Sequence, residues 1–287
     1  MTLPSRGGPP APEPHDRDPL RGGPLEGGPL RRRVALVTGT SRRIGIGAAI
    51  ARRLGLDGAR LFLTSWSPHD AEMPWGEDPE GPEALVAELR AGGIEATHVT
   101  TDLADPDAPA RLVDEVVRTY GGIDIVVANH ARSSTHDLER LTAHEIDLTY
   151  AVNVRATLLL AQAYARRHDD DRPGGRLVLF TSGQHKGPMP GELSYAASKG
   201  ALHQVTASLA AALLSRGITV NTVNPGPTDT GWATPELHRW VEEHTLSGRW
   251  GTPDDAARLV AWLVSDDARW ITGQVIDSEG GFGWGSR

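Results

Sequence analysis

Short apolar runs alternate with longer stretches of helical periodicity along most of this sequence. The apolar runs lie at 34–37, 60–64, 95–99, 123–127, 176–180, 219–223 and 274–277, and the helical stretches lie at 47–56, 82–91, 108–120, 143–167, 195–216 and 253–265. This alternation is typical of repeated strand–helix–strand units, which build a parallel sheet with helices packed against it. It predicts seven strands in a single α/β domain, with no second domain required.

Capping residues mark two of the expected helix starts. Thr142 and Glu145 have the spacing of a capping box. Thr252 is followed by Pro253 and Asp255, which supply an N-cap, a first-turn proline and a first-turn acid. We expect helices to begin directly after Thr142 and Thr252.

The first 32 residues have a different composition from the rest. They are rich in Pro, Gly and Arg, with Gly-Gly-Pro at 7–9, 22–24 and 27–29. Such a segment buries too little apolar surface to offset its ordering entropy, so we expect a disordered tail over 1–32, with a partner-binding arm as the alternative. The folded domain is expected over 33–287.

Composition excludes several classes of function. The 287 residues include no cysteine, which rules out disulfides, thiolate metal sites and cysteine nucleophiles. The net charge of -8 argues against a nucleic-acid partner, because phosphate binding needs a basic surface. No apolar run approaches the roughly 18 residues of a membrane span, and the N-terminus lacks the apolar stretch of a signal peptide. We expect a cytoplasmic protein with no nucleic-acid, membrane or metal partner.

A glycine-rich loop joins the first expected strand to the first expected helix. From Thr38 to Gly47 the sequence reads Thr-Gly-Thr-Ser-Arg-Arg-Ile-Gly-Ile-Gly. Glycines permit a tight turn and a close backbone approach, and the N-terminus of the following helix favours a pyrophosphate. The context predicts a dinucleotide site, whereas the same glycines in isolation could simply form a turn.

A tyrosine and a lysine share one face of the expected helix 195–216. Tyr195 and Lys199 are four residues apart. A free phenol has a pKa of about 10, and a neighbouring cation favours the phenolate and lowers that pKa. The pair therefore predicts an acid–base group, although such a pair taken singly is more often a surface contact.

These features, with Asn153, Ser182 and Asn224-Pro225-Gly226, follow one another in the order seen in short-chain dehydrogenases/reductases. The resemblance covers about residues 33–283 and is closest to the branch that is similar to 3-oxoacyl-carrier-protein reductases. It implies a Rossmann-type doubly wound sheet in the order 3-2-1-4-5-6-7, with the active site at the carboxyl ends of the strands. It also implies hydride transfer between a nicotinamide cofactor and a small carbonyl or alcohol substrate.

The resemblance implies a role for each of four residues. Tyr195 would exchange a proton with the substrate oxygen, and Ser182 would hydrogen-bond the same oxygen. Lys199 would bind the nicotinamide ribose and lower the pKa of the tyrosine. Asn153 would hold a water that joins Lys199 to solvent.

Further positions resemble the cofactor contacts of the family. Asp102 with Leu103 would hold the adenine amine, and the turn after the sixth strand would orient the nicotinamide amide. The full set comprises Gly39, Ser41, Arg42, Arg43, Gly45, Ile46, Gly47, Ser65, Trp66, Asp102, Leu103, Asn129, Tyr195, Lys199, Pro225, Gly226, Thr228 and Thr230.

NADP(H) is expected over NAD(H), which stays as the alternative. Ser65 stands where many NAD-selective relatives carry an acid, so no carboxylate is expected there to repel a 2′-phosphate. Arg42 and Arg43 can pair with that phosphate.

The sequence departs from the family pattern in two motifs. The glycine loop looks two residues longer than usual, and an ungapped alignment would place Arg43 at a glycine position. Asn129 is flanked by Ala128, His130 and Ala131 where the family has Asn-Asn-Ala-Gly, which puts the local backbone in question. We expect His130 to be a structural residue near the cofactor rather than a second acid–base group.

Residues 65–81 replace a connection that usually has 2 to 6 residues. We call this segment the strap. Trp66 within it could stack on the adenosine end of the cofactor. A surface elaboration or an oligomer contact is the equal alternative.

Two expectations concern the C-terminal third of the chain. Residues 231–250, the lid segment, should form a mobile lid over the substrate. Trp262, Trp270, Phe282 and Trp284 should contribute to a homotetramer or homodimer interface.

The alternatives for function are an enzyme of the same fold that uses the cofactor for epimerisation or dehydration, and a non-catalytic cofactor-binding regulator. Net NADPH consumption discriminates against the first alternative. Intact Ser182, Tyr195 and Lys199 argue against the second.

Overall fold

The computed structural model describes residues 27–172 and 174–283, so residues 1–26 of the expected tail lie outside the described part. Residues 27–32 were wrongly assigned to that tail. Leu30 is fully buried in the core, and its backbone N–H donates to Asp57 O at 2.9 Å. One apolar side chain is enough to attach this short turn to the domain, because burying a leucine stabilises the folded state by about 2 kcal/mol.

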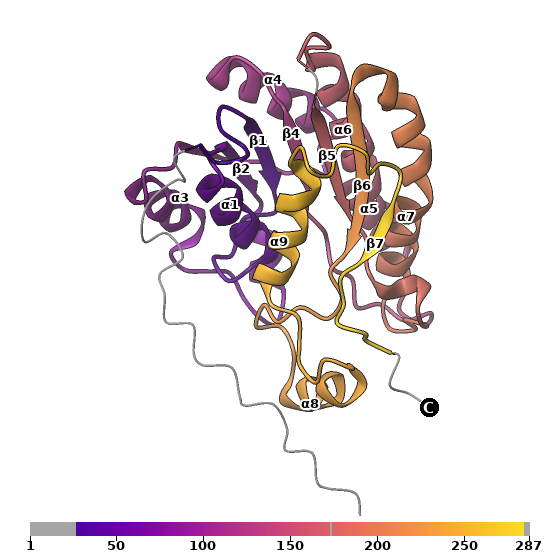
Figure 1. The fold of residues 1–287 in the computed structure, drawn as a ribbon. Helices are drawn as coiled ribbons and strands as arrows, with labels where there is room; N and C mark the ends of the chain where they lie inside the picture. The colour runs from indigo at the N-terminus through magenta and orange to yellow at the C-terminus, as the bar shows by residue number, and fades with distance from the viewer. Residues whose placement is uncertain (1–26, 173, 284–287) are drawn as a thin grey trace, which may run out of the picture.

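A parallel sheet forms the centre of the molecule (Figure 1). Its order is β3-β2-β1-β4-β5-β6-β7, and every neighbouring pair is parallel. The predicted single domain with seven strands in this order is confirmed. The strands are β1 (Val34–Thr38), β2 (Arg60–Ser65), β3 (Ala96–Thr100), β4 (Ile125–Ala128), β5 (Gly175–Phe180), β6 (Ile218–Asn224) and β7 (Val275–Asp277).

Helices cover both faces of the sheet (Figure 1). One apolar core lies between the sheet and α1, α3 and α9, and a second lies between the sheet and α4, α6 and α7. The helices are α1 (Ile46–Leu56), α2 (Ser67–Glu72), α3 (Gly81–Ala91), α4 (Ala108–Tyr120), α5 (Ala143–Tyr150), α6 (Ala156–Arg167), α7 (Leu193–Leu213), α8 (Pro235–His244) and α9 (Pro253–Val264), with the short turns η1 (Ala151–Arg155), η2 (Gly183–His185) and η3 (Leu214–Arg216).

The expected helix 143–167 is interrupted by the π-helical turn η1 between α5 and α6. Its start agrees with the prediction, because Thr142 Oγ1 accepts from the backbone N–H of Glu145 at 3.1 Å. Only half of the expected capping box forms there, since the Glu145 carboxylate pairs with Arg132 instead. Both halves form at Thr252 and Asp255.

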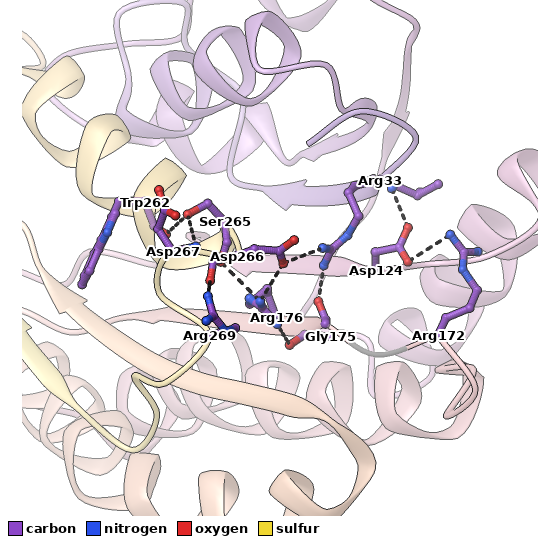
Figure 2. Close-up of polar contacts among 12 residues, drawn as sticks. Arg33, Asp124, Arg172, Gly175, Arg176, Trp262, Ser265, Asp266, Asp267 and Arg269 are labelled. Carbon is purple, nitrogen blue, oxygen red and sulfur yellow. Dashed lines mark hydrogen bonds and ion pairs between the residues drawn. The ribbon is translucent and has the colours of Figure 1, made fainter. Parts of the chain in front are cut away.

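Contacts between arginine and aspartate tie the strands together at their amino ends (Figure 2). Arg176 at the start of β5 has a side chain only 3% exposed and pairs with Asp266 after α9 at 3.3 Å. Asp124 before β4 accepts from the backbone N–H of Val34 at 2.8 Å and pairs with Arg172 at 3.3 Å. This cluster therefore holds together the amino ends of the strands, on the opposite side of the sheet from their carboxyl ends.

No helix among the described residues is long and apolar enough to cross a membrane.

Candidate active site

A cavity of about 1210 Å³ opens at the carboxyl ends of the strands. Its walls come from the glycine loop, the strap, the segments that follow β3, β4, β5 and β6, and the lid segment. Tertiary structure thus brings into one cavity most of the residues that sequence motifs had singled out. These are Gly39, Ser41, Arg42, Gly45, Ile46, Ser65, Trp66, Asp102, Leu103, Asn129, Ser182, Tyr195, Lys199, Pro225, Gly226, Thr228 and Thr230.

The glycine loop brings the start of α1 against the end of β1. A Cβ on Gly47 would lie 2.2 Å from Gly39 O, so Gly47 permits close helix packing and does not itself line the cavity. Gly39 has a φ of +75° and lies against Asn129, whose Nδ2 donates to Gly39 O at 3.0 Å. Gly45 is the N-cap residue of α1 and has no side chain that could accept from the first backbone N–H groups of the helix. The residues there fit a pyrophosphate, because free backbone N–H groups at a helix start bind anions.

The two arginines of the loop differ in their contacts. Arg42 lines the cavity and donates to Thr230 O at 2.9 Å. Arg43 does not line it, which corrects its expected pairing with a cofactor phosphate. Its guanidinium and its backbone N–H are bound by Asp78 of the strap, and Glu80 also pairs with it. These carboxylates already neutralise the Arg43 charge.

Tyr195 lies in the first turn of α7, with Ser182 beside it after β5. Burial raises the pKa of the Tyr195 phenol to about 12, while a hydrogen bond with Ser182 opposes the rise and Glu192 adds to it. The lowered pKa that was expected from Lys199 is not seen in this structure, where burial raises the value. Desolvation of the buried phenolate is the largest cause of this rise. The phenol is protonated at neutral pH.

Lys199 is fully buried and anchored to the end of β5. Its Nζ donates to Phe180 O at 3.0 Å and lies 5.6 Å from the centre of the Tyr195 ring. Burial lowers the pKa of the ammonium to about 8. The expected spacing thus does put the two side chains together, with the lysine nitrogen near the ring.

Asn153 lies in η1 and has a different set of contacts from that expected. Its Nδ2 donates to Arg132 O at 3.0 Å and to Ser198 Oγ at 2.9 Å, and its Oδ1 accepts from Arg132 N at 2.7 Å. The side chain is fully buried and does not line the cavity. Asn153 therefore joins the loop after β4 to α7 through its side chain, and the water that it was expected to hold beside Lys199 stays a prediction.

His130 is a structural residue, as the sequence analysis predicted. Its Nδ1 lies 2.7 Å from Thr38 Oγ1, and its Nε2 lies 3.1 Å from Val152 O. Burial, with a contribution from the charge of Lys199, lowers the pKa of His130 to about 3. A neutral, hydrogen-bonded imidazole here connects β1 to η1 and holds the loop after β4.

The strap lies along the cavity. Trp66, His69 and Trp75 line it, and Arg42 lies over the Trp75 ring at 5.8 Å. His69 Nε2 accepts from the backbone N–H of Ser133 at 3.1 Å, which fastens α2 to the loop after β4. The position of Trp66 is thus compatible with the expected stacking on a cofactor, which stays a prediction beside the alternative of a surface elaboration or an oligomer contact.

The comparisons with known proteins agree with this geometry. A family model described as enoyl-(acyl carrier protein) reductase matches residues 39–283. An uncharacterized oxidoreductase, YjdA of Bacillus subtilis, is 42% identical over 87% of this chain and 96% of its own length. The chain belongs to the short-chain dehydrogenase/reductase family.

Two solved structures of such enzymes superpose closely. A short-chain dehydrogenase from Burkholderia cenocepacia in complex with NADP has a TM-score of 0.78 and 39% identity, over 88% of this chain and 98% of that chain. The angucycline C-6 ketoreductase LanV with bound NADP has a TM-score of 0.78 and 33% identity, over 90% of this chain and 98% of that chain. This short-chain dehydrogenase/reductase is an oxidoreductase, and both of these structural neighbours were solved with NADP.

Arg132 and Phe282 line the cavity although no sequence motif indicated it. Arg132 lines the cavity and pairs with Glu145 at 3.2 Å. Its place after Asn129-His130-Ala131, at the carboxyl end of a strand, was the available signal. Phe282 was expected at a subunit interface, but it lines the cavity and contacts Trp240 edge-on at 5.8 Å. Trp284, which was also expected at a subunit interface, lies outside the described residues.

Proposed function

We propose that the protein catalyses the reversible reduction of a ketone to a secondary alcohol with NADP(H). One observation carries this proposal: the hydroxyl of Tyr195 hydrogen-bonds Ser182, with Lys199 near its ring, in the cavity where most of the expected cofactor positions lie. A phenol holds its proton at neutral pH and can give it to a carbonyl oxygen as negative charge develops on that oxygen.

The bound nicotinamide would supply the hydride for the carbonyl carbon. Tyr195 Oη gives its proton to the carbonyl oxygen, whose π-electron pair becomes the new O–H bond. Ser182 hydrogen-bonds that oxygen as negative charge develops on it. The Lys199 ammonium, which lies 5.6 Å from the ring centre, stabilises the phenolate that remains. One ketone, one NADPH and one proton thus become one alcohol and one NADP⁺.

NADP(H) is supported as the cofactor by two lines of argument. The neighbours from Burkholderia cenocepacia and LanV were solved with NADP. In this chain Ser65 brings no carboxylate to the cavity, and Arg42 lines it with its positive charge. Arg43 adds nothing to this preference, because Asp78 and Glu80 hold it.

The decisive test of the reaction is Tyr195→Phe. This variant removes the transferable proton and almost no volume, so we expect at least a 100-fold loss of kcat in ketone reduction with little change in NADPH binding. NADPH oxidation is followed with a panel of ketones, and NADPH affinity by fluorescence. Alcohol formed in equal amount to NADPH consumed supports reduction. Wild-type turnover by the variant would reject the role of Tyr195.

The cofactor preference is tested by measuring Kd for NADPH and NADH. Tighter binding of NADPH is expected for the wild-type enzyme, and Arg42→Gln should reduce the difference by about tenfold because one charged contact is lost. Arg43→Gln is the matched control, since its charge is already paired. Tighter NADH binding would contradict the preference.

A further inference from the structure

The lid side of the cavity is lined by aromatic side chains. Trp232 and Trp240 of the lid segment and Phe282 after β7 all line it. Trp232 is 42% exposed and Trp240 is 47% exposed, so a large part of each indole has no protein neighbour. Aromatic surface that faces a cavity is costly to leave in water, and a ligand that covers it gains affinity.

These rings are held in place by their other contacts. Trp232 Nε1 donates to Thr228 O at 3.1 Å, and its ring meets Trp250 edge-on at 5.6 Å. Trp240 stacks on His244 at 4.3 Å, with an interplanar angle of 22°. The indoles are thus preorganised, which lowers the entropic cost of ligand binding.

The chain after β7 fastens the lid segment and sets the position of Phe282. Ser247 N donates to Gly280 O at 3.1 Å, and Gly283 N donates to His244 O at 2.9 Å. Gly280 has a φ of +63°, and a Cβ there would lie 2.7 Å from Ser247 Oγ. Glycine is therefore needed for this approach, and the approach brings Phe282 against Trp240 in the cavity.

Three further ionisable residues that line the cavity, Lys186, Glu192 and Glu279, together give an anionic ligand no net positive partner. Lys186 is engaged by Asp277 at 3.2 Å and by Glu279, so its charge is balanced. Glu192 and Glu279 bring carboxylates to the same cavity, and burial raises the pKa of Glu192. The charges of Lys186 and Glu279 offset one another and burial favours the uncharged form of Glu192, so an uncharged ring system fits here without an ionic partner.

We propose that the substrate is an uncharged, fused-ring aromatic ketone whose rings lie against Trp232, Trp240 and Phe282. Its carbonyl oxygen would be bound by Ser182 and Tyr195, so the inference rests on the proposed function. Trp232 and Trp240 are then specificity-determining residues. The three rings supply stacking and edge contacts, which select flat aromatic ligands over flexible aliphatic chains.

A series of ketones with one, two and three fused rings tests this inference. Cyclohexanone, 1-tetralone and 4-oxo-1,2,3,4-tetrahydrophenanthrene are compared with an acetoacetyl thioester, with NADPH saturating. We expect kcat/KM to rise about tenfold with each aromatic ring added and to exceed that of the thioester, because each ring adds contact with an indole. A higher kcat/KM for the thioester would overturn the inference and leave the proposed ketone reduction intact.

Substitution of the indoles provides the second arm. Trp240→Leu and Trp232→Leu should raise KM for the tricyclic ketone about tenfold, with KM for cyclohexanone and the Kd of NADPH unchanged. Leu138→Ala is the control, because Leu138 is 78% exposed and does not line the cavity. Circular dichroism checks that each variant is folded. Equal KM values for the tricyclic ketone in wild type and Trp240→Leu would refute the role of the aromatic wall.

The inference can be separated from the proposed function if no ketone oxidises NADPH. Calorimetry then measures binding of the tricyclic ketone to the NADP⁺ complex of the full chain. An affinity about tenfold weaker in Trp240→Leu than in wild type and Leu138→Ala supports the aromatic site. Equal affinity in all three proteins overturns it.

Discussion

Arg43 of the glycine loop binds both carboxylate oxygens of Asp78 in the strap, with nitrogen–oxygen distances of 2.9 to 3.0 Å. The glycine loop looks two residues longer than the family pattern, and the strap is longer than the usual connection. These two long segments thus contact each other. The strap is fastened at its other end by His69, which accepts from Ser133 N after β4. Two departures from the family pattern together form one wall of the cofactor cavity.

Asp78→Asn tests the energy of this contact. Arg43 holds the pKa of the Asp78 carboxyl well below its usual value, so the pair stabilises the folded state at neutral pH. We expect the variant to lower the free energy of unfolding by about 1 to 2 kcal/mol at pH 7. A depressed carboxyl pKa contributes stability that is lost as pH falls below the unfolded value of about 4, so the deficit should shrink at pH 3.

Urea unfolding at pH 7 and pH 3 measures that difference. Glu80→Gln serves as the comparison, because Glu80 is largely exposed and its pairing with Arg43 should contribute under 1 kcal/mol. A larger effect for Glu80→Gln than for Asp78→Asn would contradict our interpretation of the contact.

His130 should stay neutral throughout the physiological pH range. Its pKa is lowered to about 3, so the folded state binds fewer protons than the unfolded state between about pH 6.5 and pH 3. The contribution of the neutral His130 to the free energy of unfolding is therefore largest above pH 6.5 and falls as the pH is lowered. Relative to His130→Gln, the wild type should lose about 2 kcal/mol between pH 6.5 and pH 5.

Two measurements check this expectation. Nuclear magnetic resonance should show no titration of the His130 ring between pH 5 and pH 8. Unfolding free energies of both proteins at pH 6.5 and pH 5 give the difference directly. A ring that titrates near pH 6.5 would mean that His130 is accessible to water and not held by Thr38.

Leu30 should be part of the stability core although it lies within a segment rich in Pro and Gly. Its side chain is fully buried against the domain, so Leu30→Ala should cost about 2 to 4 kcal/mol. Leu138→Ala is the control, since Leu138 is 78% exposed. Thermal or urea unfolding that shows the same stability for both variants would place the domain boundary after Leu30.

We propose that the enzyme is a homotetramer, or at least a homodimer, with an interface that includes Trp262 and Trp270. Both tryptophans are exposed within the described chain, and exposed aromatic surface often marks subunit contacts. Light scattering at micromolar concentration should give a multiple of 30.7 kDa, and Trp262→Glu with Trp270→Glu should shift the mass toward the monomer. Leu214→Glu is the control, and a monomeric wild type would contradict the proposal.

Periodicity and local motifs were sufficient for the fold and for much of the site. Short continuous apolar runs between helical stretches predicted the strands, because strands buried on both faces of a parallel sheet need apolar side chains on both faces. Tyr195 and Lys199 could be paired from their spacing, since residues four apart on a helix share a face. The glycine loop was recognisable for a similar reason, because its backbone requirements are local.

Contacts between distant segments decided the rest. Arg43 was expected at a phosphate, and only folding brings Asp78 to it from 35 residues away. The pKa of Tyr195 rises because the fold removes water from the phenol, an effect that no spacing reports. Phe282 lies in the cavity because the chain after β7 pairs with the lid segment. Local spacing determines which groups the chain can offer, and burial with long-range pairing determines which of them remain available to a ligand.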